Sequence, residues 1–268
     1  MTLGDVLRGA TDYLESRGVP SPRVDAELLL AHALGLQRME LYTQHDRPLT
    51  EAERGEAREL VRRRGLREPL AYVLGEWGFR RLVLKTDARA LVPRPETEVV
   101  VERALALLDG MEHPRVLDIG TGTGAIALAI AQEHSGARVT ATDVSADALA
   151  LARENAERLG LEVELVEADL ASGDGYDLVV SNPPYVHADE YAALEPEVRE
   201  WEPRLALVDD GQTERIVRFP RGRWLVLEVH EADAREVEEL MRAAGYSAVR
   251  TTLDLNGRPR VVEGRWTS

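Results

Sequence analysis

The stretch Val116-Leu117-Asp118-Ile119-Gly120-Thr121-Gly122-Thr123-Gly124 decides the fold of this 268-residue chain. Its apolar first half is typical of a strand, and the segment from Ala125 to Glu133, which begins with seven apolar residues, is typical of a helix. Three glycines between a strand and a helix let the backbone turn tightly and let a ligand approach the main chain. In open α/β sheets, ligands bind beyond the carboxyl ends of the strands. The stretch therefore predicts a ligand site at such an end.

Strands and helices alternate in the chain after this stretch. Further strands are predicted over 138–143, 162–168, 176–181 and 224–229. Helices are predicted between them over 145–159 and 232–243. Asn256-Gly257 lies between alternating apolar residues, which is a strong hairpin signal, so two antiparallel strands close the chain. The pattern predicts an α/β fold with a doubly wound, Rossmann-like sheet of seven strands in mixed directions.

The first 75 residues have a different pattern, which is typical of a small helical bundle. Apolar residues from Leu3 to Leu14 recur at helical spacing, Ser21-Pro22 is an N-cap and first-turn pair, and Thr50 to Glu53 is a capping box. Apolar alternation and then Pro93-Arg94-Pro95 predict an extended β-hairpin linker. We therefore predict a helical recognition domain over 1–75, a hairpin linker over 76–95 and an α/β domain over 96–268.

Composition narrows the possible functions. The net charge of −15 makes stable binding to nucleic acid a poor expectation, because such binding comes mainly from Lys and Arg on phosphates. The seven-residue apolar stretch Ala125 to Ala131 is far shorter than the roughly 20 residues of a membrane span. The six histidines have no metal-ligand spacing, so no metal site is predicted. The absence of cysteine fits a reducing compartment, and we expect a cytoplasmic protein.

Acidic residues at successive strand ends indicate which ligand the glycine loop holds. Asp143, 23 residues after Gly120, suits a bidentate grip on ribose hydroxyls. Asp169, beside Leu170, could accept a hydrogen bond from an adenine amino group. The negative charge of Asp118 would attract a cationic amino acid and repel a pyrophosphate. Gly120, Gly122 and Ala125 also satisfy the looser dinucleotide-binding pattern, so the glycines alone do not exclude NAD. The three acidic residues at the strand ends favour S-adenosylmethionine instead.

A second motif, Ser181-Asn182-Pro183-Pro184-Tyr185, follows the strand over 176–181. Each proline holds the residue before it extended and offers no N–H of its own. The Asn182 side-chain carbonyl, the Pro183 backbone carbonyl and the Tyr185 ring are then left pointing outward. Two acceptors and a flat face together fit a planar NH2 group.

The chemistry of an amide nitrogen agrees with this motif. Its lone pair is delocalised into the carbonyl, so it is a weak nucleophile. Two acceptors that take both N–H bonds orient the nitrogen and stabilise the positive charge that develops on it. Ring stacking holds the plane in place. Asn182, Pro183 and Tyr185 are therefore the candidate catalytic residues, and Asn182 to Tyr185, with Pro184, the candidate substrate-binding residues.

Over nearly its whole length the sequence resembles the HemK/PrmC family of release-factor glutamine methyltransferases. The resemblance includes the linker Leu91-Val92-Pro93-Arg94-Pro95-Glu96-Thr97-Glu98, which DNA adenine methyltransferases with the Asn-Pro-Pro-Tyr motif lack, and the closing 254–260 segment. It implies a class I methyltransferase fold and a helical domain that helps to recognise the partner. The implied substrate is the glutamine of a Gly-Gly-Gln motif in class I peptide chain release factors.

The resemblance also assigns residues. The implied contacts to S-adenosylmethionine are Asp118, Gly120, Thr121, Gly122, Thr123, Gly124, Asp143, Asp169, Leu170 and Asn182. The sequence departs from the family between Val208 and Arg223, where Pro220-Arg221-Gly222 replaces a usual Gly-Gly turn, and at His230, where glycine is common. The main alternative is an N6-adenine methyltransferase acting on DNA or RNA, which would have to flip its base out of the stack. A non-catalytic module would more readily have lost Asn182 or Asp143.

Overall fold

The structure, a computed structural model, describes residues 1–170, 174–219 and 222–266. The chain divides into two compact units. The first consists of Met1–Glu76 together with Glu195–Trp201, and the second of Trp77–Leu194 together with Glu202–Ser268. The short segment 195–201 therefore belongs to the helical unit, although it lies far along the sequence. None of the helices in the described residues is both long and apolar enough to cross a membrane.

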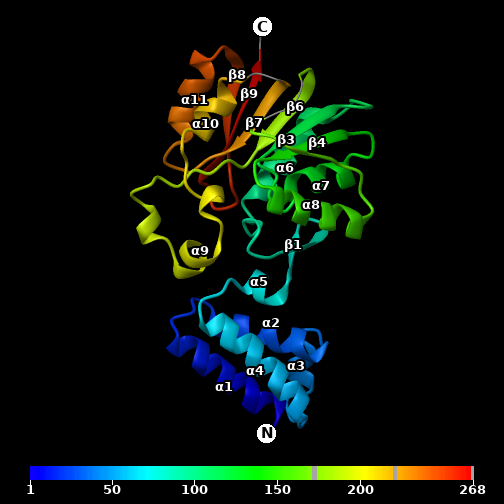
Figure 1. Ribbon diagram of the computed structural model, residues 1–268, viewed down its shortest axis with the longest axis vertical. Helices are drawn as coiled ribbons and strands as arrows, with labels where there is room; N and C mark the ends of the chain where they lie inside the picture. The colour runs from blue at the N-terminus through cyan, green and yellow to red at the C-terminus, as the bar shows by residue number, and fades with distance from the viewer. Residues whose placement is uncertain (171–173, 220–221, 267–268) are drawn as a thin grey trace. The chain divides into compact units, whose positions relative to one another are not determined.

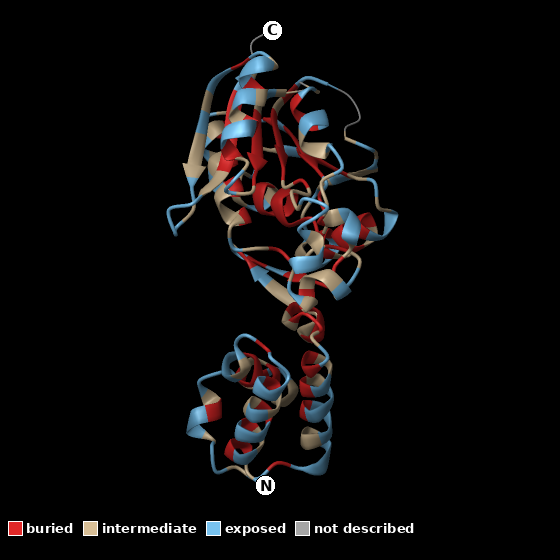
Figure 2. Ribbon diagram, turned by 90° about the vertical axis from the view of Figure 1, so that its left-hand side faces the viewer, coloured by how far each residue is buried: buried red, intermediate tan, exposed pale blue. Residues whose placement is uncertain are grey.

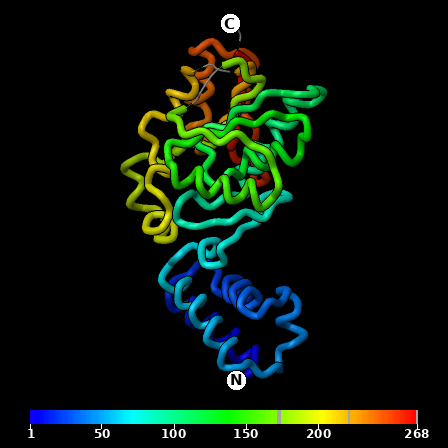
Figure 3. Tube along the Cα trace, turned by 45° about the vertical axis from the view of Figure 1, so that its right-hand side comes forward, coloured from blue at the N-terminus to red at the C-terminus, as the bar shows by residue number. Residues whose placement is uncertain are grey.

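The first unit is helical. Its helices are α1 (Leu3–Ser16), α2 (Pro22–Leu34), α3 (Glu40–Thr43), α4 (Glu51–Gly65), α5 (Leu70–Leu74) and α9 (Pro196–Trp201); the first five run from blue to cyan in Figure 3. The capping box predicted at Thr50 and Glu53 is confirmed, and a second one between Thr2 and Asp5, which was not predicted, opens α1. Ser21 precedes Pro22 as predicted but makes no side-chain capping bond.

Charged side chains are buried inside this helical unit. Arg64, which is 5% exposed, donates to Asp25 at 2.7 Å and to Glu197 of α9 at 2.8 Å. Arg67 donates to both oxygens of Glu197. Because a buried ion pair is costly to break by removing one partner, this cluster ties the 195–201 segment firmly to α4.

The second unit is built on one sheet of seven strands, which confirms the predicted fold class. The strands are β3 (Arg115–Ile119), β4 (Arg138–Asp143), β5 (Glu164–Glu167), β6 (Tyr176–Ser181), β7 (Gly222–Glu228), β8 (Tyr246–Leu253) and β9 (Pro259–Trp266). Their order is β5-β4-β3-β6-β7-β9-β8, and β9 alone runs antiparallel to β7. Consecutive strands extend from β3 toward β5 and then from β6 in the opposite direction. The switch point of the sheet therefore lies between β3 and β6, where ligands of such sheets bind.

Helices cover both faces of this sheet (Figure 1). One face carries α6 (Thr97–Leu108), α7 (Ala125–Glu133) and α8 (Ala146–Leu159); the other carries α10 (Gln212–Val217) and α11 (Ala234–Ala243). Successive residues of β3 face opposite sides of the sheet. Val116 belongs to the core under α6 and α7, and Leu117 belongs to the core under α10 and α11. Figure 2 shows the central strands of the sheet as buried between these layers. Two turns of 3₁₀ helix, η1 (Tyr191–Ala193) and η2 (Arg204–Ala206), lie in the long β6–β7 connection.

The hairpin within the predicted linker is shorter than the segment assigned to it. It pairs β1 (Glu76–Phe79) with β2 (Leu82–Lys85), and the chain then runs to α6 without further strand. The fully buried Asn155 of α8 fixes this hairpin to the α/β unit. Its side chain accepts from the Lys85 N–H at 2.7 Å and donates to the Lys85 carbonyl at 3.1 Å and to the Thr123 carbonyl at 2.9 Å. The hairpin and the glycine loop thus share one polar anchor.

Candidate active site

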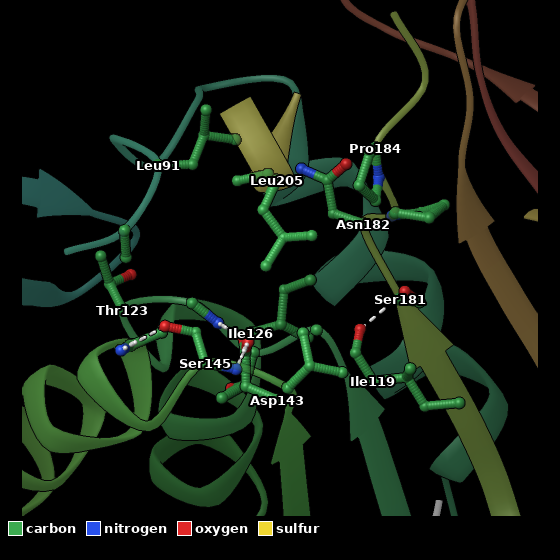
Figure 4. Close-up of a pocket in the computed structure, with 18 of the residues that line it drawn as sticks. Leu91, Ile119, Thr123, Ile126, Asp143, Ser145, Ser181, Asn182, Pro184 and Leu205 are labelled. Carbon is green, nitrogen blue, oxygen red and sulfur yellow. Dashed lines mark hydrogen bonds between the residues drawn. The ribbon is translucent and has the colours of Figure 1, made fainter. Parts of the chain in front are cut away.

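A cavity of about 370 Å³ lies at the carboxyl ends of the parallel strands. Its lining comes from the loops after β3, β4, β5 and β6, from the chain between β2 and α6, and from the β6–β7 connection. Figure 4 shows Asn182 and Leu205 on one side of it and Ile126, Asp143 and Ser145 on the other. This volume lies in the usual range for small-molecule sites.

The glycine loop forms the floor of the cavity as backbone. Gly120 has φ +71° and Gly124 φ +84°, a region that side chains with a Cβ rarely adopt. A Cβ on Gly124 would also lie 2.9 Å from Leu128 Cδ1. The Gly120 and Thr121 N–H groups both donate to the Thr142 carbonyl at 2.9 Å, which anchors the loop to β4. Gly120 to Thr123 line the cavity, whereas Gly124 lies beneath it at the start of α7.

Asp143 lies at the end of β4 and lines the cavity, where the sequence placed it. Its Oδ2 accepts the Gly122 N–H at 2.9 Å, and its Oδ1 accepts the Ser145 N–H at 2.9 Å (Figure 4). Both bonds come from fixed backbone, so the carboxylate is held in one orientation. Each oxygen keeps a further lone pair for a ligand hydroxyl.

Asp118 lies elsewhere than its predicted role requires. Its carboxyl is fully buried and is absent from the lining of the cavity. Oδ2 accepts the Thr121 hydroxyl at 2.7 Å and the Ala127 N–H at 3.2 Å, whereas Oδ1 is buried with no hydrogen-bond partner among the described residues. The predicted position of Asp118 at a strand end is correct, but its inward-facing carboxyl lies beneath the loop, where it accepts from Thr121 and Ala127. In the structure it supports the loop from below.

Burial raises the pKa of Asp118 to about 7, with a smaller contribution from the nearby Asp143 charge. The folded state therefore holds a proton that the unfolded chain has released above its ordinary pKa, so stability falls as pH rises from about 4 to 7. Asp118→Asn cannot ionise. We measure the free energy of unfolding by urea denaturation and subtract the wild-type value from that of the variant. This difference should increase by roughly a few kcal/mol between pH 5 and pH 8.

The matched control for this measurement is Asp147→Asn, because Asp147 is an exposed acid in the first turn of α8. Its stability curve should run parallel to that of the wild type over the same pH range. Parallel curves for Asp118→Asn as well would contradict a buried, proton-retaining carboxyl at this position.

The chain after β5 supplies the far wall of the cavity. Leu170 lines it with φ +75°, and its carbonyl accepts the Thr142 hydroxyl at 2.5 Å. Asp169 also lines the cavity but is largely exposed and accepts from Arg215 of α10 at 2.6 Å. The Asp169 carboxylate is thus shared with a guanidinium that sequence reasoning did not consider. Pro220 and Arg221, in the segment noted for its unusual turn, lie outside the described residues.

The Asn-Pro-Pro-Tyr motif directly follows β6, and Asn182, Pro183 and Pro184 line the cavity. The Asn182 Nδ2 donates to the Thr97 hydroxyl at 3.2 Å, which leaves the Oδ1 acceptor for a ligand. Tyr185 does not line the cavity; its hydroxyl donates to Glu228 Oε1 at 3.3 Å. The Ser181 hydroxyl donates to the Ile119 carbonyl at 2.7 Å and joins the motif to the end of β3 (Figure 4).

Sequence reasoning missed two polar residues of this site, Thr97 and Glu228. Thr97 is the first residue of α6, and Glu228 is the last residue of β7. Both are buried, at 4% and 1% exposure. A signal for Glu228 was present, because it is an acid that ends an apolar strand, as Asp143 does. Thr97 gave no such signal, since a threonine at the start of a helix is usually read as a cap.

Two family profiles match the chain: PrmC N-terminal domain over residues 5–75 and Methyltransferase small domain over residues 99–205. Release factor glutamine methyltransferase of Deinococcus radiodurans is 44% identical over 99% of both chains. That of Chlorobaculum tepidum is 41% identical over 94% of this chain and 93% of its own. The chain belongs to the release factor glutamine methyltransferases. The family predicted from the Asn-Pro-Pro-Tyr motif and the linker is thereby confirmed.

Solved structures of methyltransferases resemble this family member in fold. The hMettl16 catalytic domain, determined with a 3′UTR hairpin, has a TM-score of 0.57 at 19% identity, over 69% of this chain and 76% of its own. The T. thermophilus 16S rRNA methyltransferase RsmC, determined with AdoMet and guanosine, has a TM-score of 0.51 at 16% identity, over 72% of this chain and 50% of its own. Identities this low show the fold alone.

This release factor glutamine methyltransferase family member is an S-adenosylmethionine-dependent enzyme, and the residues present fit that cofactor. The open backbone at Gly120 admits a close ligand, and Asp143 offers acceptors for ribose hydroxyls. Apolar side chains for an adenine ring line the same cavity: Ile119, Val144, Leu205 and Ile216. No group of His, Cys, Asp and Glu in the described part of the chain could hold a metal ion.

Proposed function

We propose that this enzyme methylates the side-chain amide nitrogen of the glutamine in the Gly-Gly-Gln motif of class I peptide chain release factors. The observation that carries the proposal is the orientation of Asn182. Its amide nitrogen is engaged by Thr97, so its carbonyl oxygen is the end left for a ligand at the cavity. An acceptor at this position suits a substrate that presents N–H bonds, as a primary amide does.

The chain's own residues account for the demands of the reaction. S-adenosylmethionine supplies an electrophilic methyl group when bound. The Asn182 side-chain carbonyl and the Pro183 backbone carbonyl take the two N–H bonds of the substrate amide and orient its nitrogen. As the bond from this nitrogen to the methyl carbon forms and the bond from that carbon to sulfur breaks, positive charge develops on the nitrogen, and both acceptors stabilise it before one proton leaves to solvent. We assign the flat face against the amide to Pro184, which lines the cavity, whereas Tyr185, predicted for this role from the sequence, lies outside the cavity lining and donates to Glu228.

The helical unit is the proposed recognition domain for the release factor. It carries its own core and its own charged cluster, and it corresponds to the PrmC N-terminal domain profile. We propose Asp143 and the Gly120 to Thr123 backbone as the cofactor's contacts, with Asp169 and Leu170 on the adenine side. Asp118 and Gly124 then act from beneath the loop.

Transfer of labelled methyl from S-adenosylmethionine to a purified release factor tests the proposal. We expect label on the wild-type factor and none on a factor whose Gly-Gly-Gln glutamine is replaced by alanine. DNA and RNA are offered as acceptors in parallel reactions. Label on nucleic acid, or equal label on the glutamine-free factor, would refute the proposed substrate and favour an adenine-directed enzyme.

A further inference from the structure

An ion pair at the cavity joins two segments that lie far apart in the sequence. Arg215 of α10 donates from Nη2 to Oδ2 of Asp169, which follows β5, at 2.6 Å. Both residues line the cavity, and their side chains are 49% and 58% exposed. An ion pair as exposed as this one contributes little to stability. Stability therefore gives little reason for a pair of charges at this position.

The backbone on both sides of Asp169 is bonded to the end of β4. The Ala168 N–H donates to the Asp143 carbonyl at 3.1 Å, and the Leu170 carbonyl accepts the Thr142 hydroxyl at 2.5 Å. Leu170 also has φ +75°, a left-handed conformation that a non-glycine residue keeps only where its surroundings hold it. The Asp169 carboxylate is therefore carried by a fixed backbone close to Asp143, the proposed ribose contact.

Arg215 comes from an element that is also well anchored. The next two residues of α10, Ile216 and Val217, are buried in the core at 3% and 0% exposure. Ile216 and Leu170 also line the cavity, so an apolar side chain adjoins each member of the ion pair in sequence. A flat heterocycle that packs against these apolar side chains would turn its polar edge toward the two charges.

The ion pair places a hydrogen-bond acceptor beside a donor. In the described part of the chain, no hydrogen bond occupies Oδ1 of Asp169 or the Nε and Nη1 atoms of Arg215. A carboxylate can only accept, and a guanidinium can only donate. Adenine presents the complementary groups, because its amino group donates and the neighbouring ring nitrogen, N1 on one edge or N7 on the other, accepts.

We propose that Arg215 is a cofactor-binding residue, which donates to a ring nitrogen of adenine while Asp169 accepts from the adjacent amino group. The ion pair holds both groups ready for that edge before the ligand arrives. Arg215 lies in the 208–223 segment, where the sequence departs from its family, and the resemblance assigns it no role. The inference rests on the proposed placement of adenine beside Asp169, and it does not depend on which substrate receives the methyl group.

Ligands that lack one ring nitrogen test this contact directly. The probe is S-adenosylhomocysteine, which the cofactor becomes when it loses its methyl group, together with two analogues in which either N1 or N7 is replaced by C–H. Isothermal titration calorimetry measures the three dissociation constants. We expect one analogue to bind the wild type about tenfold more weakly than the parent, the usual loss of one hydrogen bond from a charged donor. The other analogue should bind as the parent does.

The decisive variant is Arg215→Met, which keeps an unbranched apolar stem and removes every donor. It should bind S-adenosylhomocysteine about tenfold more weakly than the wild type does. It should bind the sensitive analogue no more weakly than the parent ligand, because the hydrogen bond is already lost. The losses caused by the variant and by the analogue should therefore not add. Arg215→Lys, which keeps the charge without the planar fork, should recover only part of the affinity.

Arg218→Met is the matched control. Arg218 caps the same helix, pairs with Glu214 at 2.7 Å and does not line the cavity. This variant should bind all three ligands as the wild type does, and neither methionine variant should change the melting temperature. Equal binding of the three ligands by the wild type, or additive losses in Arg215→Met, would overturn the proposal. Unchanged or tighter binding of the parent ligand by Arg215→Met would also overturn it, because Arg215 would then at most compete with adenine for Asp169.

These measurements separate the proposal from the proposed function. They contain no methyl acceptor, so a failure of the proposed glutamine substrate would leave a contact between Arg215 and adenine standing. Conversely, a release factor could be methylated at its glutamine by an enzyme in which the calorimetric losses prove additive, and the role proposed for Arg215 would then be refuted alone.

Discussion

Replacement of Asn182 by alanine is expected to lower kcat for release-factor methylation by roughly 10²- to 10³-fold, the usual loss when one polar group that faces developing charge is removed. Asn182 lines the cavity and offers Oδ1 as an acceptor, while Thr97 holds its nitrogen. The Pro183 backbone carbonyl remains in the variant, so one N–H bond of the substrate keeps its acceptor. The amide nitrogen would still bind but would be oriented at one point instead of two.

Single-turnover rates of labelled methyl transfer check this expectation, with S-adenosylmethionine affinity measured in parallel. Affinity should change less than tenfold, because Asp143 and the glycine loop stay in place. Asn256→Ala is the control, since Asn256 is an exposed residue of the β8–β9 turn. A rate for Asn182→Ala within a factor of ten of the wild type would remove the amide-acceptor role from this side chain.

The backbone of the site could be predicted because its determinants are local. A strand, three glycines and a helix within 116–133 position the loop. Asp143 and the Asn-Pro-Pro-Tyr motif each directly follow an apolar strand, and parallel strands bring their carboxyl ends to one edge. Sequence alone therefore gives which segments meet. The strand order and the switch point confirm that these ends meet at one cavity.

Side-chain direction and long-range pairing could not be predicted in the same way. Asp118 is only two residues from Gly120, yet its carboxyl lies under the loop, where it accepts the Thr121 hydroxyl and the Ala127 N–H of the chain that turns back over the strand end. Thr97 and Glu228 lie on different elements and meet only when α6 packs on β7. Glu197 joins the helical unit across a similar distance in sequence. No local pattern encodes such contacts.

Replacement of Asp143 by alanine is expected to raise the dissociation constant for S-adenosylmethionine by about 100-fold or more. Hydrogen bonds to a charged acceptor contribute about 1.5–3 kcal/mol each, and in the proposed binding mode two ribose hydroxyls depend on this carboxylate. The variant also loses the bonds from the Gly122 and Ser145 N–H groups that hold the loop beside the ligand. Equilibrium calorimetry measures the change.

Asp143→Asn divides this loss into its two causes. The asparagine keeps one acceptor oxygen for the Gly122 or Ser145 N–H but turns the other into a donor, so part of the loop's anchorage survives while the bidentate grip on the ribose is lost. An affinity for Asp143→Asn close to that of Asp143→Ala would assign the effect mainly to lost contacts with the ligand. An affinity near that of the wild type would assign it to lost anchorage of the loop.

The control is Asp147→Ala, because Asp147 is an exposed acid of the same segment; this variant should bind S-adenosylmethionine as the wild type does. Equal affinities in Asp143→Ala and the wild type would mean that the ribose is held elsewhere, and the next candidate at these strand ends would be Asp169, once its pairing with Arg215 is broken.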